Sequence, residues 1–213
     1  MIPPADYTMR IVSYMVKAVE SQRGRPRSAR ADAALTLAVR ELLGTVGYPS
    51  MSIEAVAVKA GVGKATIYRR WTSKAEMVFA LVIHDTQIEL PAHSRSLPQD
   101  VSALVTHVVR LLTEPSARAA LPGLLADVAG DPALADRFHA TFIQPQRGLV
   151  AALLKTATDR GELVRVPDAK AVHARILGAV FTPLFLLAEP PPDDLSARVT
   201  TEILTSLPTT RQL

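Results

Sequence analysis

Apolar residues recur with the spacing of an α-helix along most of the chain, without the apolar–polar alternation between tight turns that marks strands. Residues 28–43 carry an apolar face, which predicts a first helix that ends at Gly44 or Gly47. Further helices are predicted at residues 99–113, 121–129, 132–160, 168–187 and 193–207. Pro145 should kink or break the longest of them, over residues 132–160. The pattern therefore predicts an all-α fold.

Helix start and stop signals lie close together between residues 52 and 76. Ser52 is a suitable N-cap for a helix over residues 53–59, and Gly61 can adopt the left-handed backbone that closes it. Residues 64–70 predict a second helix, which is too short to fold alone. The sequence SKAE, starting at Ser73, matches a capping box and predicts a further helix to about residue 90, before Pro91. Three capped helices with a short turn predict a helix-turn-helix.

The short helix over residues 64–70 carries side chains suited to DNA. Its lysine, tyrosine and arginines can bind phosphates, and Thr66 can meet a base edge. Ile67 and Trp71 should point back and fix the helix to its companions, whereas Arg69 is open to either DNA or solvent. The side chains expected to contact DNA are Ser52, Lys64, Thr66, Tyr68, Arg69, Arg70 and Lys74.

Basic residues concentrate around this motif. The chain has a formal net charge of +4. Between Arg23 and Lys74, ten basic residues accompany three acidic ones, so this segment carries +7 and the rest of the chain −3. A basic run alone is most often a solvated surface. Its coincidence with a helix-turn-helix favours binding to double-stranded DNA.

The sequence RGRPR, starting at Arg23, precedes the first predicted helix. Glycine and proline oppose helix formation, so we expect an unstructured basic arm there. Arg25 and Arg27 suit the narrow minor groove or the phosphates beside it, and a plain solvated tail is an equal alternative. The first twenty residues are compatible with a short amphipathic helix.

Composition and motifs argue against several other functions. Cysteine is absent, which excludes disulfides and cysteine metal sites. The sequence has no Walker loop, GxSxG elbow or HExxH motif, so we expect no enzyme activity, no cofactor and no metal. The N-terminus lacks a secretory signal, and the nearest candidate for a membrane span, residues 176–188, is too short and contains Pro183. We therefore expect a cytoplasmic protein without a membrane partner.

The motif residues resemble those of the TetR family of transcriptional regulators, over about residues 29–81. Residues 53–62, IEAVAVKAGV, are similar to the family's second helix and turn, and residues 65–71, ATIYRRW, to its recognition helix. Gly63 stands where the family usually has a serine-like cap, and Trp71 where it has phenylalanine. Glycine costs only a few tenths of a kcal/mol as an N-cap, so the departure is tolerable.

The resemblance implies residues 1–27 as an extension and basic arm, 28–74 as a helix-turn-helix domain, and 75–213 as a helical ligand-binding and dimerisation domain. It also implies that the last two helices pair with their copies across a twofold axis. Two recognition helices would then reach successive major-groove faces of a near-palindromic operator. The residues expected at the interface are Ala174, Leu177, Gly178, Phe181, Ile203 and Leu207.

The family's central helices enclose a small-molecule pocket, which implies an effector site here. Each assignment competes with a core role, since an apolar residue on a buried helix face more often packs than binds ligand. The low polarity of these helices favours a mainly apolar ligand. The expected lining is Val105, His107, Val109, Leu125, Phe138, Phe142, His173 and Phe181, with Val108, Leu124, Val128, His139, Thr141 and Gln144.

These features together predict a homodimeric, ligand-responsive, DNA-binding transcriptional regulator, most simply a repressor that occludes a promoter. Two alternatives stay open: an activator on the same fold, and a ligand-binding helical protein whose DNA-binding element has degenerated. Preference for promoter DNA over scrambled DNA, with a steep salt dependence, separates a regulator from the second alternative.

Overall fold

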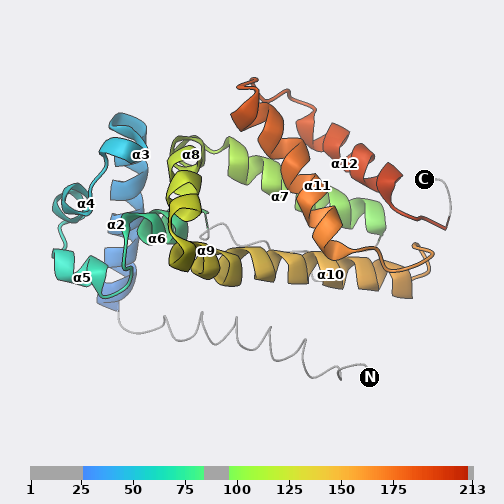
Figure 1. The fold of residues 1–213 in the computed structure, drawn as a ribbon, viewed down its shortest axis with the longest axis horizontal. Coiled ribbons are helices and arrows are strands. Elements are labelled where there is room, and N and C mark those ends of the chain that lie inside the picture. Colours follow the sequence, from blue (N-terminus) through green and yellow to red (C-terminus); the bar gives the residue numbers. More distant parts are fainter. Residues whose placement is uncertain (1–25, 84–95, 211–213) are drawn as a thin grey trace.

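The computed structural model describes residues 26–83 and 96–210, and the all-α prediction is confirmed. We call helices α2 to α6 the N-terminal bundle, which lies at the left of Figure 1. Ser52 caps α4 as predicted, because its Oγ accepts a hydrogen bond from the Ala55 N–H at 3.1 Å. Gly61 closes that helix with a φ of 65°. The first four helices are α2 (Pro26–Thr45), α3 (Gly47–Ser50), α4 (Ile53–Ala60) and α5 (Lys64–Tyr68).

Two boundaries in the N-terminal bundle differ from the prediction. Helix α2 begins at Pro26, so the backbone of Arg27 is helical and the expectation of an unstructured arm through Arg27 is wrong. Proline suits a first helical position, because the N–H that it lacks would have no helical partner there. Helix α5 ends at Tyr68 instead of residue 70. Arg25 and the first twenty residues lie outside the described part of the chain.

Helix α6 (Lys74–Val78) and the π-helical segment η1 (Phe79–Ile83) lead out of the N-terminal bundle. The Ser73 Oγ accepts a hydrogen bond from the Glu76 N–H at 3.1 Å, as a capping box requires. The Glu76 carboxylate reaches back one residue further than usual and accepts from the Thr72 N–H at 2.6 Å. The helix predicted to reach residue 90 is followed here to Ile83, and its remainder lies outside the described residues.

The C-terminal part consists of helices packed on one another (Figure 1). Helix α8 begins at Pro115, earlier than predicted, and contains Pro122. Pro115 stands at the boundary between α7 and α8 and occupies the first turn of α8, which proline fits. The elements are α7 (Leu97–Thr113), α8 (Pro115–Gly130), α9 (Pro132–Phe138), η2 (His139–Ile143), α10 (Gln144–Asp159), α11 (Ala169–Phe181), η3 (Thr182–Leu186) and α12 (Leu195–Ser206).

The long helix predicted over residues 132–160 continues past Pro145. Helix α9, the π-helical segment η2 and helix α10 follow one another without a gap, along the lower edge of the molecule in Figure 1. Pro145 lies in the first turn of α10, directly after η2. Proline removes one helical N–H, and a local change to wider π-helical turns is a known way for a helix to absorb such a defect. The expected break is therefore replaced by η2.

One cluster of buried apolar side chains runs from the N-terminal bundle through α8 into the C-terminal helices. Ile203 and Leu207 belong to this cluster and are almost fully buried within the chain. The expectation that these two residues face a partner subunit is therefore wrong. The inward face of α12 packs instead on α7 of the same chain.

Helix α11 and η3 together form an apolar stretch of 18 residues, Ala169–Leu186, which by length and composition could cross a membrane. The prediction that no stretch of the chain reaches this length is therefore wrong. Only 28% of the stretch is buried within the chain. One such helix is weak support for a membrane span, because an apolar helix that is covered by a second subunit has the same length and composition.

Candidate nucleic-acid interface

Helix α5 lies at the outer edge of the N-terminal bundle, and the turn before it sets its position. The Val62 N–H donates to the Ala57 carbonyl at 3.0 Å, which fastens the turn after Gly61 to the end of α4. The Val62 side chain packs partly against the core. Figure 1 shows α4 and α5 as the elements farthest from the C-terminal helices, where a duplex could approach them.

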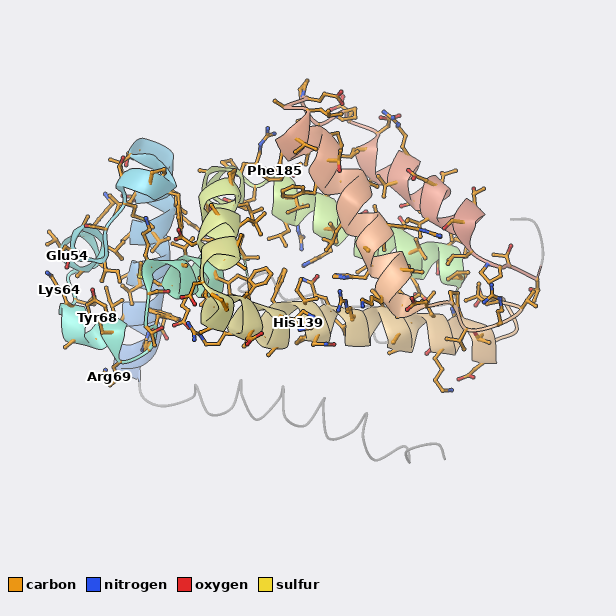
Figure 2. The ribbon with its side chains drawn as sticks, viewed as in Figure 1. Glu54, Lys64, Tyr68, Arg69, His139 and Phe185 are labelled. Atoms are coloured by element: carbon orange, nitrogen blue, oxygen red, sulfur yellow. The ribbon has the colours of Figure 1, made fainter. Side chains whose placement is uncertain are left out.

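One side of α5 is buried and the opposite side is open. Ile67 is fully buried and is the anchor of the helix, as predicted. Lys64, Tyr68 and Arg69 are exposed, with 51% of Tyr68 accessible, and Thr66 is half-buried. Figure 2 shows the three exposed side chains along the outer surface of the bundle. The structure thus gathers four of the predicted DNA contacts at one open surface.

Two of the basic side chains have acidic partners within the bundle. The Lys64 Nζ lies 2.7 Å from the Glu54 Oε1 of helix α4. This hydrogen bond and the lysine charge lower the pKa of Glu54 below its usual value. Arg70 forms an ion pair with Asp32 of helix α2. Exposed pairs of this kind are weak, so phosphate groups can compete with the carboxylates for both cations.

Lys74 and Ser52 are placed differently from the α5 side chains. The Lys74 Nζ donates to the Tyr48 carbonyl at 2.9 Å and lies 4.3 Å from the centroid of the Tyr48 ring. Lys74 therefore points toward helix α3 in the present structure. The Ser52 Oγ serves as the cap of α4, with its own hydroxyl hydrogen left to donate.

Sequence reasoning missed the contact that fixes the N-terminal bundle on helix α8. The Tyr48 hydroxyl donates to the Asp127 Oδ2 at 2.5 Å, and the tyrosine is only 2% exposed. Burial, followed by the hydrogen bond to Asp127 and the charge of that residue, raises the pKa of Tyr48. Gly123 faces the ring, and a Cβ atom there would lie 2.3 Å from the Tyr48 Cδ1. We call Tyr48, Gly123 and Asp127 the domain joint. A glycine in mid-helix was the one signal for it in the sequence.

The residues predicted to line an effector pocket differ in burial. Val105, His107 and His173 are buried, whereas Val109, Leu125, Phe138, Phe142 and Phe181 are half-buried. A cavity of about 350 Å³ lies between helices α6, α8 and α9, and we call it the junction cavity. Of the predicted lining, it includes Leu124, Val128, Phe138 and Thr141.

Buried His173 has a partner within the C-terminal helices. Its Nε2 lies 2.9 Å from the Gln146 Oε1. Burial, and next the positive charge of Arg147, lower the pKa of His173. Within residues 26–83 and 96–210, no three His, Asp or Glu side chains are grouped as a metal site.

Comparisons with known proteins cover both parts of the chain. Residues 35–81 match the family model for bacterial regulatory proteins of the tetR family. Residues 91–203 match the model for the tetracyclin repressor-like C-terminal domain, so the second match spans more than half of the chain.

Individual relatives agree with these family matches. The uncharacterized HTH-type transcriptional regulator Rv1556 of Mycobacterium tuberculosis is 31% identical, over 85% of this chain and 90% of its own length. The DNA-binding transcriptional repressor TetR of Mycobacteroides abscessus is 29% identical, over 85% of this chain and 94% of its own length. The crystal structure of the TetR family regulator SCO0332 superposes with a TM-score of 0.64 at 27% identity, covering 83% of this chain and 98% of that one. The chain therefore belongs to the TetR family of helix-turn-helix, DNA-binding transcriptional regulators, which is not a family of enzymes.

Proposed function

We propose that this regulator is a cytoplasmic homodimeric repressor, which binds a near-palindromic operator and is released by a small, mainly apolar ligand. The observation that carries the DNA-binding part is the open surface of α5, where cationic and hydroxyl side chains project outward from the buried anchor Ile67. Such a surface fits the major groove, where phosphate contacts set the position and base contacts set the sequence. A bound dimer represses by occupying the site where polymerase must load.

Each side chain has a proposed role on the duplex. Thr66 and Lys64 meet base edges or nearby phosphates, and Tyr68 binds a phosphate through its hydroxyl. Arg69 forms no ion pair with an acidic side chain of the described residues and serves either role. Arg70 binds a phosphate after leaving Asp32, and Lys74 binds a phosphate after leaving the Tyr48 carbonyl.

Two further proposals concern the flanks of this interface. Arg25 and Arg27 reach the minor groove or its phosphates, with Arg27 acting from the first turn of α2. The DNA-binding domain ends at about residue 74, and residues 75–213 form the ligand-binding and dimerisation domain. The first proposal rests on the concentration of basic residues in this part of the chain, and the second rests on the order of the helices.

Fluorescence anisotropy with DNA from the protein's own promoter region tests the DNA-binding role. We expect tighter binding than to scrambled DNA, and a linear fall of log K with log salt concentration. Replacing Arg69 by glutamine should lower the slope by about 1.8, since the dimer loses one phosphate contact from each subunit and each contributes about 0.9. The matched control is Arg198→Gln on the exposed side of α12, which should leave the slope unchanged. Equal slopes for both variants would show that Arg69 faces solvent.

Substitution of Ser52 separates its capping role from a DNA contact. Ser52→Asp keeps a good N-cap on α4, so the melting temperature should stay close to that of the original protein. The added negative charge should repel phosphates and weaken operator binding. Ser52→Ala should instead cost about 0.5–2 kcal/mol of stability through the lost cap. If the Asp variant binds DNA as tightly as the original, Ser52 does not approach the duplex.

The exposed face of α11 supports the proposed dimer. Ala171, Ala174 and Gly178 are exposed at helical spacing, and 76% of Leu186 is accessible. Small residues allow close approach of helices, and large exposed apolar side chains indicate a surface that a partner covers. This face replaces the interface assignments of Ile203 and Leu207, while Leu177 and Phe181 stay half-buried at its edge.

A pair of glycines tests this interface. A Cβ atom at Gly178 or at Gly148 of helix α10 meets no other atom within 4 Å inside one chain. Gly178→Arg should therefore fold normally and give a monomer in light scattering, whereas Gly148→Arg should remain a dimer. A Gly178→Arg dimer, or a monomeric original protein, would contradict the proposed interface.

A further inference from the structure

The junction cavity is bounded by residues of both parts of the molecule. Helix α6 of the N-terminal bundle meets helices α8 and α9 (Figure 1), and the cavity of about 350 Å³ lies among them. Its wall also includes Arg70 and Trp71, two and three residues after the end of the recognition helix α5. The volume falls in the range of about 300–1,000 Å³ that is typical of small-molecule sites.

The wall of the junction cavity is aromatic and aliphatic. Trp71, Phe79 and Phe138 supply three rings, and the centroids of the two phenylalanines lie 4.9 Å apart in an edge-to-face arrangement. Leu124 and Val128 of helix α8 add aliphatic surface. Aromatic rings in this arrangement favour a flat apolar ligand, which can stack on one ring and contact the edge of another.

The charged side chains in the wall form ion pairs within the protein. Arg137 of helix α9 forms an ion pair with Glu76, and Arg70 with Asp32. The Glu76 carboxylate also accepts hydrogen bonds from the N–H and the Oγ1 of Thr72. A charged ligand would have to break one of these ion pairs or leave its own charge unpaired. The wall therefore favours an uncharged ligand.

The cavity is linked directly to the recognition helix. The Trp71 N–H donates to the Ile67 carbonyl at 3.0 Å, so the indole extends from the end of α5. Glu76 holds Thr72, the next residue, and connects it through Arg137 to α9. A molecule that displaces the indole thus shifts the segment on which α5 is mounted, without a relay through the remaining helices.

We propose that the junction cavity binds an uncharged, planar aromatic molecule against Trp71, Phe79 and Phe138, and that this molecule repositions α5. The regulatory consequence rests on the proposed function, whereas the binding event does not. The proposal differs from a pocket among the central helices, because one wall belongs to the DNA-binding element itself. The ligand then acts at the place where the recognition helix is anchored.

Trp71 is the one tryptophan of the chain, so its emission reports directly on this cavity. The probe is N-phenyl-1-naphthylamine, which is uncharged, added to the full-length protein. We expect saturable probe fluorescence excited by energy transfer from Trp71. The matched anion, 8-anilino-1-naphthalenesulfonate, should bind at least about tenfold more weakly, because its sulfonate finds no free cation in the wall. Equal binding of the two probes, or binding without energy transfer, would overturn the proposal.

Two variants test whether the probe binds in the junction cavity. Ala80→Leu adds bulk to the wall, and Thr141→Phe blocks its edge from an exposed position that the fold tolerates. Both should weaken probe binding at least about tenfold, whereas Ala126→Leu on the exposed side of α8 should not change it. Unchanged binding to Thr141→Phe would overturn the assignment even if Ala80→Leu fails to fold.

Promoter DNA separates this inference from the proposed function. The probe should change the affinity for that DNA by about 5–150-fold, the usual range of coupling between two sites. Operator binding without any probe binding would overturn the inference and leave the DNA-binding function intact. Probe binding with unchanged DNA affinity would overturn the coupling to α5. Loss of specific DNA binding in the absence of probe would refute the proposed function instead.

Discussion

Replacing Ile67 by alanine is expected to abolish operator binding by unfolding the DNA-binding element, although Ile67 itself contacts no DNA. Ile67 is fully buried, and helix α5 spans only Lys64–Tyr68, too short to persist without its anchor. Truncating a buried isoleucine to alanine costs about 2–5 kcal/mol. For a chain of this size, each kcal/mol lowers the melting temperature by about 2–4 °C. Thermal unfolding and anisotropy should therefore both show the loss.

Tyr68→Phe is the matched control for this prediction. Tyr68 follows Ile67 directly but faces outward, so the loss of its hydroxyl should leave the melting temperature unchanged and weaken DNA binding only modestly. Ile67→Val should fall between the two, at about 0.5–1.5 kcal/mol. An Ile67→Ala protein with the original melting temperature and no DNA binding would mean that Ile67 acts by contact and not by anchoring.

Replacing Gly123 by alanine is expected to destabilise the protein, against the usual rule for helices. Alanine is better than glycine in a helix interior by about 1 kcal/mol. At the domain joint, however, the new Cβ would lie 2.3 Å from the Tyr48 ring. That ring is held by Asp127 at its hydroxyl and by Lys74 at its face, so it has little room to move. Overpacking of this kind costs about 1–3 kcal/mol and should outweigh the gain in propensity.

Gly148→Ala provides the control, because Gly148 lies inside helix α10 with no atom near an added Cβ. Calorimetry should show a raised melting temperature for Gly148→Ala and a lowered one for Gly123→Ala. Adding Tyr48→Val should remove the clash, so the double variant should lose less than the sum of the two single losses. Strict additivity, or a stabilised Gly123→Ala protein, would show that the joint is not tightly packed.

Local signals in the sequence predicted the N-terminal bundle well. Ser52, Gly61 and Ser73 act over two or three residues, and each forms the cap that its residue type indicates. The buried position of Ile67 follows from the same helical spacing. Proline was harder to interpret: Pro145 was expected to kink or break a long helix, whereas the helical run continues past it with Pro145 in the first turn of α10.

Contacts between distant segments could not be predicted in the same way. Tyr48 and Gly123 lie 75 positions apart, and although a glycine inside a helix marks an unusual position, nothing near either residue indicates which segment it touches. Val105 and other residues of the predicted pocket lining are buried. An apolar helix face looks the same whether it packs or binds a ligand, so the pocket stays a prediction.

Selection of binding sites from a random DNA pool by the purified full-length protein tests the central claim most directly. If α5 enters the major groove from each subunit of a dimer, the enriched sequences should form an inverted repeat. Its half-site centres should lie about one helical turn, or a multiple of it, apart. The Ile67→Ala protein should enrich nothing. A folded original protein that enriches no sequence, even at low salt, would contradict the account.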